Sequence, residues 1–428
     1  MGTDATGPTS REPVAGRRAP SEVLISGASV AGPVTAYWLH RAGHHVTVVE
    51  QSAPRRRTGG HAVDLFTPAM DVIERMGVLE AVQDHATGTE RITVRREHTD
   101  RDVTIDMTRL MGALSDRHVE IMRDDLGAIL YDATRADVEY VFDDRITGLT
   151  DDGVATFERG PERRFDLVIG ADGLHSGVRG LVFGSETEYS RWLGGYIAVA
   201  SIPRDRGLAG HMTTLLGVNR MVGLYSARHM TDARAFFLFR PGAELAYDHR
   251  DVPRQKQLLR EAFGDLDGEV PRLLDEVDRA PAFYFDAITQ LAMDHWTRGR
   301  VALVGDAGYC PGPAVGGSTS LAVVGAYTLA GELAAAGGDP AIAYPAYEAA
   351  MRDYVHRSRG FATTMARRLV PGTRAGAWML TAGTSLLTHL PTALGRRLVA
   401  LGSGGLGLHE SIQVRDYPAL KDGQGDRR

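Results

Sequence analysis

The sequence predicts an α/β protein in which a parallel sheet is interrupted by an inserted, mainly antiparallel sheet and followed by C-terminal helices. Residues 23–50 hold an apolar strand, a glycine-rich turn, a helix pattern and a second strand, which is typical of a parallel βαβ unit. Residues 185–285 change to short alternating segments, which favour antiparallel strands with one buried face. Because a buried strand returns at 299–308, we expect the first domain to resume after the insertion.

The composition is that of an ordinary globular chain. Its 428 residues are 43% hydrophobic and 24% charged, and the net charge of −6 disfavours a nucleic-acid partner, since such proteins are usually basic. The single cysteine, Cys310, excludes an intramolecular disulfide and a zinc site built on several cysteines, so we expect no metal and a cytoplasmic location. Residues 1–20 predict a flexible tail rather than a secretory signal. The apolar stretch 375–390 is too short to span a membrane and predicts a packed helix.

The first strand leads into the stretch ISGASVAGP at residues 25–33. Pro33 suits the first turn of the following helix, where its missing N–H is not needed, and Gly43 marks the end of that helix. The second strand, HHVTVVE, covers residues 44–50. We therefore expect the fold to begin near Glu22 with a strand, a turn, a helix and a strand.

The turn itself has two interpretations. Gly27 and Gly32 supply the tight bend and the close helix packing of a dinucleotide-binding turn, and Ser29 takes the place of the middle glycine. Glu50, 18 positions after Gly32, is placed to accept a hydrogen bond from a ribose hydroxyl. The alternative is a nucleophile elbow with Ser29 as the nucleophile, which requires a longer sheet before the turn than the chain before Val23 provides. The sequence therefore favours a bound dinucleotide.

Two later motifs also follow buried strands. DLVIGADGLHSGVR, at residues 166–179, ends its strand at Asp172 and Gly173. GRVALVGDAGYCPGPAVGG, at residues 299–317, ends its strand at Gly305 and Asp306 and enters a helix through a glycine- and proline-rich loop. Each motif alone is equally well a plain strand and turn. A helix N-terminus after such a loop would stabilise negative charge on a bound group.

Together, these three motifs resemble those of the single-component flavoprotein monooxygenases of the p-hydroxybenzoate hydroxylase type, across residues 22–360. Within that family, the motifs are most similar to those of the shorter members that modify tetracyclines and other polyketides. The resemblance implies a Rossmann-like FAD-binding domain, with NADPH or NADH as a transient cosubstrate. It implies hydroxylation of an aromatic or polyketide-like molecule by O2 through a flavin hydroperoxide, as in antibiotic biosynthesis. Baeyer–Villiger oxidation, epoxidation and a flavin-binding biosynthetic partner without turnover remain open.

The resemblance also implies roles for individual residues. Those expected to bind the cofactor are Gly27, Ser29 and Gly32 at the pyrophosphate, Glu50 at the ribose, Arg123 at the flavin side chain, Asp172 and Gly173 at FAD and the nicotinamide cofactor, Gly305 and Asp306 at the ribityl chain, and Pro313, Gly316 and Gly317 under the flavin ring. On the inserted sheet, alternation weakly suggests Met212, Tyr225 and Phe237 as substrate contacts between the sheet and the flavin loop.

The expected domain boundaries follow from the same pattern. They are 21–76, 116–185 and 286–335 for the FAD-binding domain, 77–115 and 186–285 for the substrate domain, 336–402 for C-terminal helices, and 1–20 and 403–428 for tails.

Several residues depart from the family pattern or have an ordinary structural explanation. Tyr309 stands where the family commonly has histidine, and Ser320 where it has asparagine. We expect Cys310 to be a small core residue and His175 to be a surface or hydrogen-bonded histidine rather than a catalytic base. The run Arg55–Arg57 predicts a solvated turn.

Overall fold

The computed structural model describes residues 20–53, 60–115, 117–204, 208–313, 317–389 and 412–420. Several predictions concern residues outside these ranges. They are the tail at 1–19, the run Arg55–Arg57, Gly316, the last part of the expected C-terminal helices and most of the C-terminal tail.

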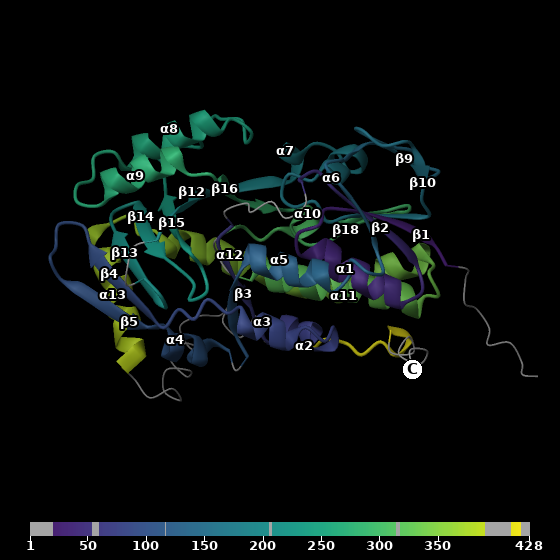
Figure 1. The fold of residues 1–428 in the computed structure, drawn as a ribbon, viewed down its shortest axis with the longest axis horizontal. Coiled ribbons are helices and arrows are strands. Elements are labelled where there is room, and N and C mark those ends of the chain that lie inside the picture. Colours follow the sequence, from purple (N-terminus) through teal and green to yellow (C-terminus); the bar gives the residue numbers. More distant parts are fainter. Residues whose placement is uncertain are drawn as a thin grey trace, which may run out of the picture.

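A six-stranded sheet forms one half of the molecule (Figure 1). Its order is β17 (Thr297–Arg298), β18 (Val301–Leu303), β11 (Leu167–Gly170), β1 (Glu22–Ser26), β2 (His45–Glu50) and β7 (Glu139–Phe142). All neighbours pair in parallel except β17 with β18. The middle of β1 is fully buried, as expected for a parallel strand covered on both faces. The predicted βαβ unit is confirmed, and the fold begins at Glu22.

Three helices pack together along this sheet: α1 (Ala31–Arg41), α5 (Arg123–Asp132) and α11 (Ser318–Ala335) (Figure 1). Most of the 18 residues of α11 are apolar, and most are buried, because the helix is enclosed by α1, α2 (Thr67–Arg75) and α12 (Pro340–Leu369). The predicted return of the first domain after the insertion is therefore seen in β18 and α11.

A seven-stranded sheet forms the other half. Its order is β16 (Phe283–Leu291), β12 (Ser190–Pro203), β15 (Asp232–Phe239), β14 (Arg220–Tyr225), β13 (His211–Leu216), β4 (Arg91–Arg96) and β5 (Asp102–Asp106). The pairs are antiparallel except for β13 with β4. The mainly antiparallel sheet predicted from the sequence is confirmed.

The expectation of one buried face on this sheet is wrong. Residues 195–202 of β12 are buried on both faces. One face packs on α8 (Val252–Phe263) and α9 (Val270–Arg279), and the other on the long helix α12. Because helices cover both faces, an apolar run replaces the alternation that a solvated face would require.

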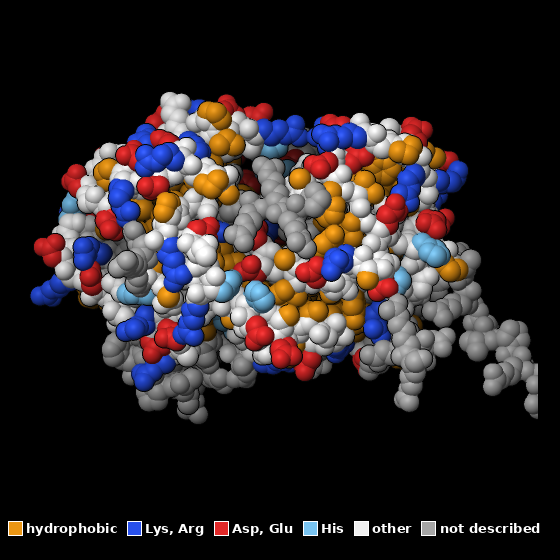
Figure 2. Space-filling view, in the orientation of Figure 1, with side chains coloured by type: hydrophobic (Ala, Val, Ile, Leu, Met, Phe, Trp, Pro, Cys, Tyr) orange, Lys and Arg blue, Asp and Glu red, His pale blue; other side chains and the backbone are white. Residues whose placement is uncertain are grey.

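The remaining elements belong to neither of the two large sheets. They are β3 (Ala62–Leu65), α3 (Leu79–Asp84), α4 (Met107–Leu114), β6 (Val119–Met122), β8 (Ile146–Leu149), β9 (Val154–Phe157), β10 (Arg163–Arg164), α6 (Gly177–Val182), α7 (Glu186–Tyr189), α10 (Asp306–Tyr309), α13 (Arg374–His389) and the 3-10 helix Pro418–Leu420. The helix predicted at 375–390 is present as α13. Among the described helices, none is both long and apolar enough to cross a bilayer. Figure 2 shows acidic and basic side chains interspersed on the viewed face.

Candidate active site

The turn between β1 and α1 needs its glycines for space. A Cβ atom on Gly32 would lie 1.9 Å from the carbonyl oxygen of Gly27, and a Cβ on Gly27 would lie 2.4 Å from that of Ala171. Gly27 also has a φ of 104°, which a side chain strongly disfavours. Within the described residues, no side chain caps the first turn of α1, so its N–H groups remain available to an anionic ligand.

Glu50, at the end of β2, lies beside this turn. One carboxylate oxygen accepts from the backbone N–H of Ala28 at 2.9 Å, and the other accepts from that of Ser52 at 2.8 Å. Parallel pairing of β1 with β2 brings this carboxylate to the turn. The structure thus places Glu50 next to the predicted pyrophosphate turn, and its contact with a ribose stays a prediction.

Arg123 joins the first motif to the start of α5. Its Nε and Nη2 atoms donate to Ser29 Oγ at 3.2 and 3.1 Å, and its backbone N–H donates to the His61 carbonyl. Since the Ser29 hydroxyl contacts a guanidinium rather than a base, the described contacts do not support a nucleophilic serine. A hydroxyl and a guanidinium at a helix N-terminus are instead the donors that a phosphate prefers.

Gly305 and Asp306 bring the third motif to the same place. Gly305 has a φ of 64°, and a Cβ there would lie 3.0 Å from Ala322 Cβ and 3.4 Å from Ala31 Cβ, so this turn packs between α1 and α11. Burial raises the pKa of the Asp306 carboxyl, while the positive charge of Arg123 opposes that rise. The first and third motifs therefore converge on Arg123.

The loop before α11 is described only in part. Gly317 immediately precedes that helix with a φ of 86°, where glycine is favoured, and Pro313 is partly exposed. Gly316 lies outside the described residues. The placement of this loop under a flavin ring stays a prediction.

Asp172 and Gly173 form the turn after β11. The Asp172 carboxylate accepts from Ser176 Oγ at 2.5 Å, from the Val178 N–H at 3.1 Å and from Ser26 Oγ at 3.3 Å, and burial raises its pKa. Gly173 has a φ of 81° and open space where a Cβ would be. Asp172 therefore holds the turn in shape, and its predicted cofactor contact stays a prediction.

The three weakly suggested substrate residues separate onto two faces. Tyr225 and Met212 belong to a cluster with Met122, and the Tyr225 hydroxyl accepts from the Ala62 N–H at 2.9 Å. Phe237 is fully buried on the opposite face, where its ring meets Phe263 at 5.1 Å between centroids. The suggestion for Phe237 is corrected: alternation along β15 turns Phe236, rather than Phe237, towards Tyr225.

The two departures from the family pattern are structural residues here. Tyr309 is fully buried, and its hydroxyl lies 2.9 Å from that of Tyr347. Ser320 Oγ accepts from the Phe66 N–H and donates to the Asp64 carbonyl, which ties α11 to β3. Cys310 is buried, and burial raises the pKa of its thiol well above the usual value. That is the core role expected for it.

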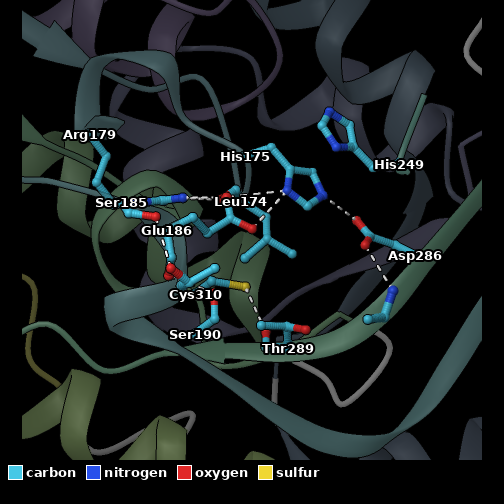
Figure 3. A network of polar contacts seen from close by, with 12 residues as sticks. Leu174, His175, Arg179, Ser185, Glu186, Ser190, His249, Asp286, Thr289 and Cys310 are labelled. Atoms are coloured by element: carbon cyan, nitrogen blue, oxygen red, sulfur yellow. Dashed lines mark hydrogen bonds and ion pairs between the residues drawn. The ribbon is translucent and has the colours of Figure 1, made fainter. Parts of the chain in front are cut away.

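Sequence reasoning missed a polar cluster centred on His175 (Figure 3). His175 lies between the carboxylates of Glu186 and Asp286, at 3.0 and 3.3 Å. The Tyr284 hydroxyl donates to the same Asp286 oxygen at 3.3 Å. The available signal was the aspartate among the apolar residues that begin the strand FYFDAITQL, since a buried charge requires a partner.

The donor set fits FAD. The uncapped N-terminus of α1, the Ser29 hydroxyl and Arg123 match a pyrophosphate, and Glu50 and Asp306 match sugar and ribityl hydroxyls. The missing Cβ atoms of Gly27, Gly32 and Gly305 allow the backbone to come close to such a group.

Comparison with known proteins agrees with FAD as the cofactor. A family model described as FAD binding domain matches residues 20–368. The chain is 46% identical over 342 residues to an uncharacterized protein of Mycobacterium tuberculosis, covering 79% of this chain and 91% of that one. It is 37% identical over 343 residues to a flavin-dependent monooxygenase of Legionella longbeachae, covering 79% and 87%. The crystal structure of tetracycline destructase Tet(55) superposes with a TM-score of 0.78 and 34% identity, covering 93% and 99%. The chain therefore belongs to the FAD-binding, NAD(P)H-using flavin monooxygenases of the p-hydroxybenzoate hydroxylase type.

Proposed function

We propose that this monooxygenase hydroxylates an aromatic or polyketide-like small molecule. One observation carries the proposal: the residues that fit FAD lie next in the chain to a cluster of aromatic and sulfur-containing side chains. Met122 directly precedes Arg123, and it packs in one cluster with Met212, Tyr225 and Phe236. Apolar and aromatic side chains with few polar groups are the usual environment of a bound aromatic substrate. The similarity to Tet(55), a tetracycline destructase, supports the same substrate class.

In this proposal, the residues of the chain bind FAD and orient the substrate. When bound, FAD takes a hydride from NADPH or NADH and supplies the oxygen chemistry with O2. Ser29, Arg123 and the α1 N-terminus hold its pyrophosphate, Glu50 its ribose and Asp306 its ribityl chain. The cluster around Tyr225 excludes water from the reacting ring. A role in polyketide tailoring and a cytoplasmic location, where nicotinamide cofactors are made, belong to the same proposal.

The first test is the visible spectrum of the purified protein before and after NADPH is added without oxygen. We expect a flavin spectrum that bleaches. A protein that binds no flavin even when FAD is supplied would contradict the site, and a spectrum that never bleaches, with or without substrate, would favour a flavin-binding partner without turnover.

The second test adds oxygen and a panel of phenolic compounds that includes tetracycline. We expect oxygen consumption coupled to a product that carries a new hydroxyl group, identified by its structure. A ring-expanded lactone or an epoxide would instead assign the Baeyer–Villiger or epoxidising alternative. Consumption of oxygen that yields only hydrogen peroxide with every compound would remove support for this substrate class.

A further inference from the structure

His175 connects the turn after β11 to the inserted sheet. Its Nδ1 atom lies 3.0 Å from Glu186 Oε1, and its Nε2 atom lies 3.3 Å from Asp286 Oδ2 on β16 (Figure 3). A ring that bridges two carboxylates needs an N–H on each nitrogen, which only the protonated imidazole provides. Burial lowers the pKa of His175, but hydrogen bonds to Asp286 and Glu186 outweigh it and raise the pKa to about 10. The bridge is therefore charged at neutral pH.

The turn that carries His175 is itself held firmly. Arg179 is fully buried, donates to Glu186 at 2.6 Å, and donates to the carbonyl of Ala307 at 2.9 Å. Ala307 directly follows Asp306 in the third motif. Arg179 thus links Glu186 to the third motif. Because the His175 ring contacts both Glu186 and Asp286, it holds Asp286 in place relative to that motif.

Asp286 in turn holds the Tyr284 hydroxyl. The Tyr284 hydroxyl donates at 3.3 Å to the same Oδ2 atom that His175 contacts. Tyr284 and Asp286 are two residues apart on β16 and so share one face of the sheet. Asp286 is nearly buried, whereas Tyr284 is partly exposed, with its ring 6.1 Å from that of His61.

Tyr284 is linked to Arg123 through His61: its ring lies 6.1 Å from that of His61, whose carbonyl accepts from the Arg123 backbone N–H at 3.2 Å. Burial raises the pKa of its phenol well above the usual value, and the charges of Asp286 and Arg123 act on it in opposite directions. Arg123 is the residue that contacts Ser29. A hydroxyl that donates to Asp286 keeps its oxygen lone pairs for an incoming donor.

We propose that His175 is a positioning residue for the monooxygenase reaction. By holding Asp286, it fixes the Tyr284 hydroxyl so that its oxygen accepts a hydrogen bond from a hydroxyl group of the substrate. The substrate part rests on the proposed function, because a phenolic or polyketide molecule supplies that hydroxyl. The bridge from His175 to Tyr284 is independent of which substrate binds.

Fluorine NMR of the FAD-loaded enzyme labelled with fluorotyrosine tests the bridge. The Tyr284 resonance is assigned by its loss in Tyr284→Phe. We expect the resonance to move in His175→Gln and in Asp286→Asn, and His175→Gln to cause no further shift in the Asp286→Asn background. The matched control is His249→Gln, since His249 stacks on His175 at 4.5 Å between ring centroids and its own ion-pair partner is Asp248. An unmoved resonance in His175→Gln, or equal shifts in both backgrounds, would overturn the proposal.

Kinetics with tetracycline as the probe test the substrate contact. We expect KM to rise about tenfold in His175→Gln and in Tyr284→Phe, with a smaller change in kcat and an unchanged flavin spectrum. The two substitutions together should raise KM no more than Tyr284→Phe alone. Multiplying effects would refute an action through Tyr284. If wild type does not turn over tetracycline but the NMR shifts appear, the substrate class fails while the bridge stands.

Discussion

Gly32→Ala, the addition of one methyl group at the turn, should weaken FAD binding. The new Cβ would lie 1.9 Å from the Gly27 carbonyl oxygen, whereas real Cβ atoms essentially never approach closer than 3.0 Å. The helix or the turn must therefore move by at least 1.1 Å, the difference between those two distances. Overpacking of this kind costs about 1–3 kcal/mol, which corresponds to about 5- to 150-fold weaker binding when the strain falls on the bound state.

Calorimetric titration of the FAD-free protein with FAD measures this effect. Gly127→Ala is the matched control, because Gly127 lies inside α5 and its Cβ would meet Ser29 O at an ordinary 3.6 Å. Alanine inside a helix should stabilise the protein by about 0.5–1 kcal/mol and leave FAD affinity unchanged. Wild-type affinity in Gly32→Ala, or equal losses in both variants, would refute the reasoning from close packing.

Four further outcomes are expected. Glu50→Gln should weaken FAD binding by about 1–2 kcal/mol in the same titration, because a neutral amide accepts less strongly from two backbone N–H groups; an unchanged affinity contradicts this. Arg179→Met should lower the free energy of unfolding by about 1–3 kcal/mol, and with it Tm, because Glu186 loses its buried partner. The loss stays moderate because the Glu186 side chain is 33% exposed to water, and an unchanged Tm argues against the pairing. The pKa of His175 is raised from 6.5 to about 10, so its stabilisation is complete below about pH 6.5 and lost towards pH 10. The Tm difference between wild type and His175→Gln should shrink across that range, and a constant difference would contradict the raised pKa. Cys310, buried with a raised thiol pKa, should react with iodoacetamide only after denaturation, as mass spectrometry can show.

Local patterns were sufficient for the elements that carry the cofactor residues. The strand, turn and helix around Gly27 are encoded within residues 22–41, since the bend needs glycine and the helix start tolerates Pro33. Each later motif likewise ends a buried strand at a turn. Because parallel strands end at one edge of a sheet, the meeting of Ser29 and Asp306 near Arg123 could be expected from the sequence.

Long-range pairing was harder to predict. Alternation along β15 shows that two faces exist without showing what covers each, and so it misassigned Phe237. The cover of the second face by α12 depends on a helix that begins more than a hundred residues after β15 ends.

The sequence by itself determined the fold class and the cofactor, and it predicted the residues around the cofactor phosphates, because such predictions depend on backbone geometry and short spacings. Only the tertiary structure decided how His175, Asp286 and Tyr284 meet, and which side chains pack with Met122 next to Arg123. His175 and Asp286 are 111 positions apart, and a charged bridge between them exists only once both sheets are assembled. Burial then makes such a bridge stronger than it would be in water, which no local pattern records.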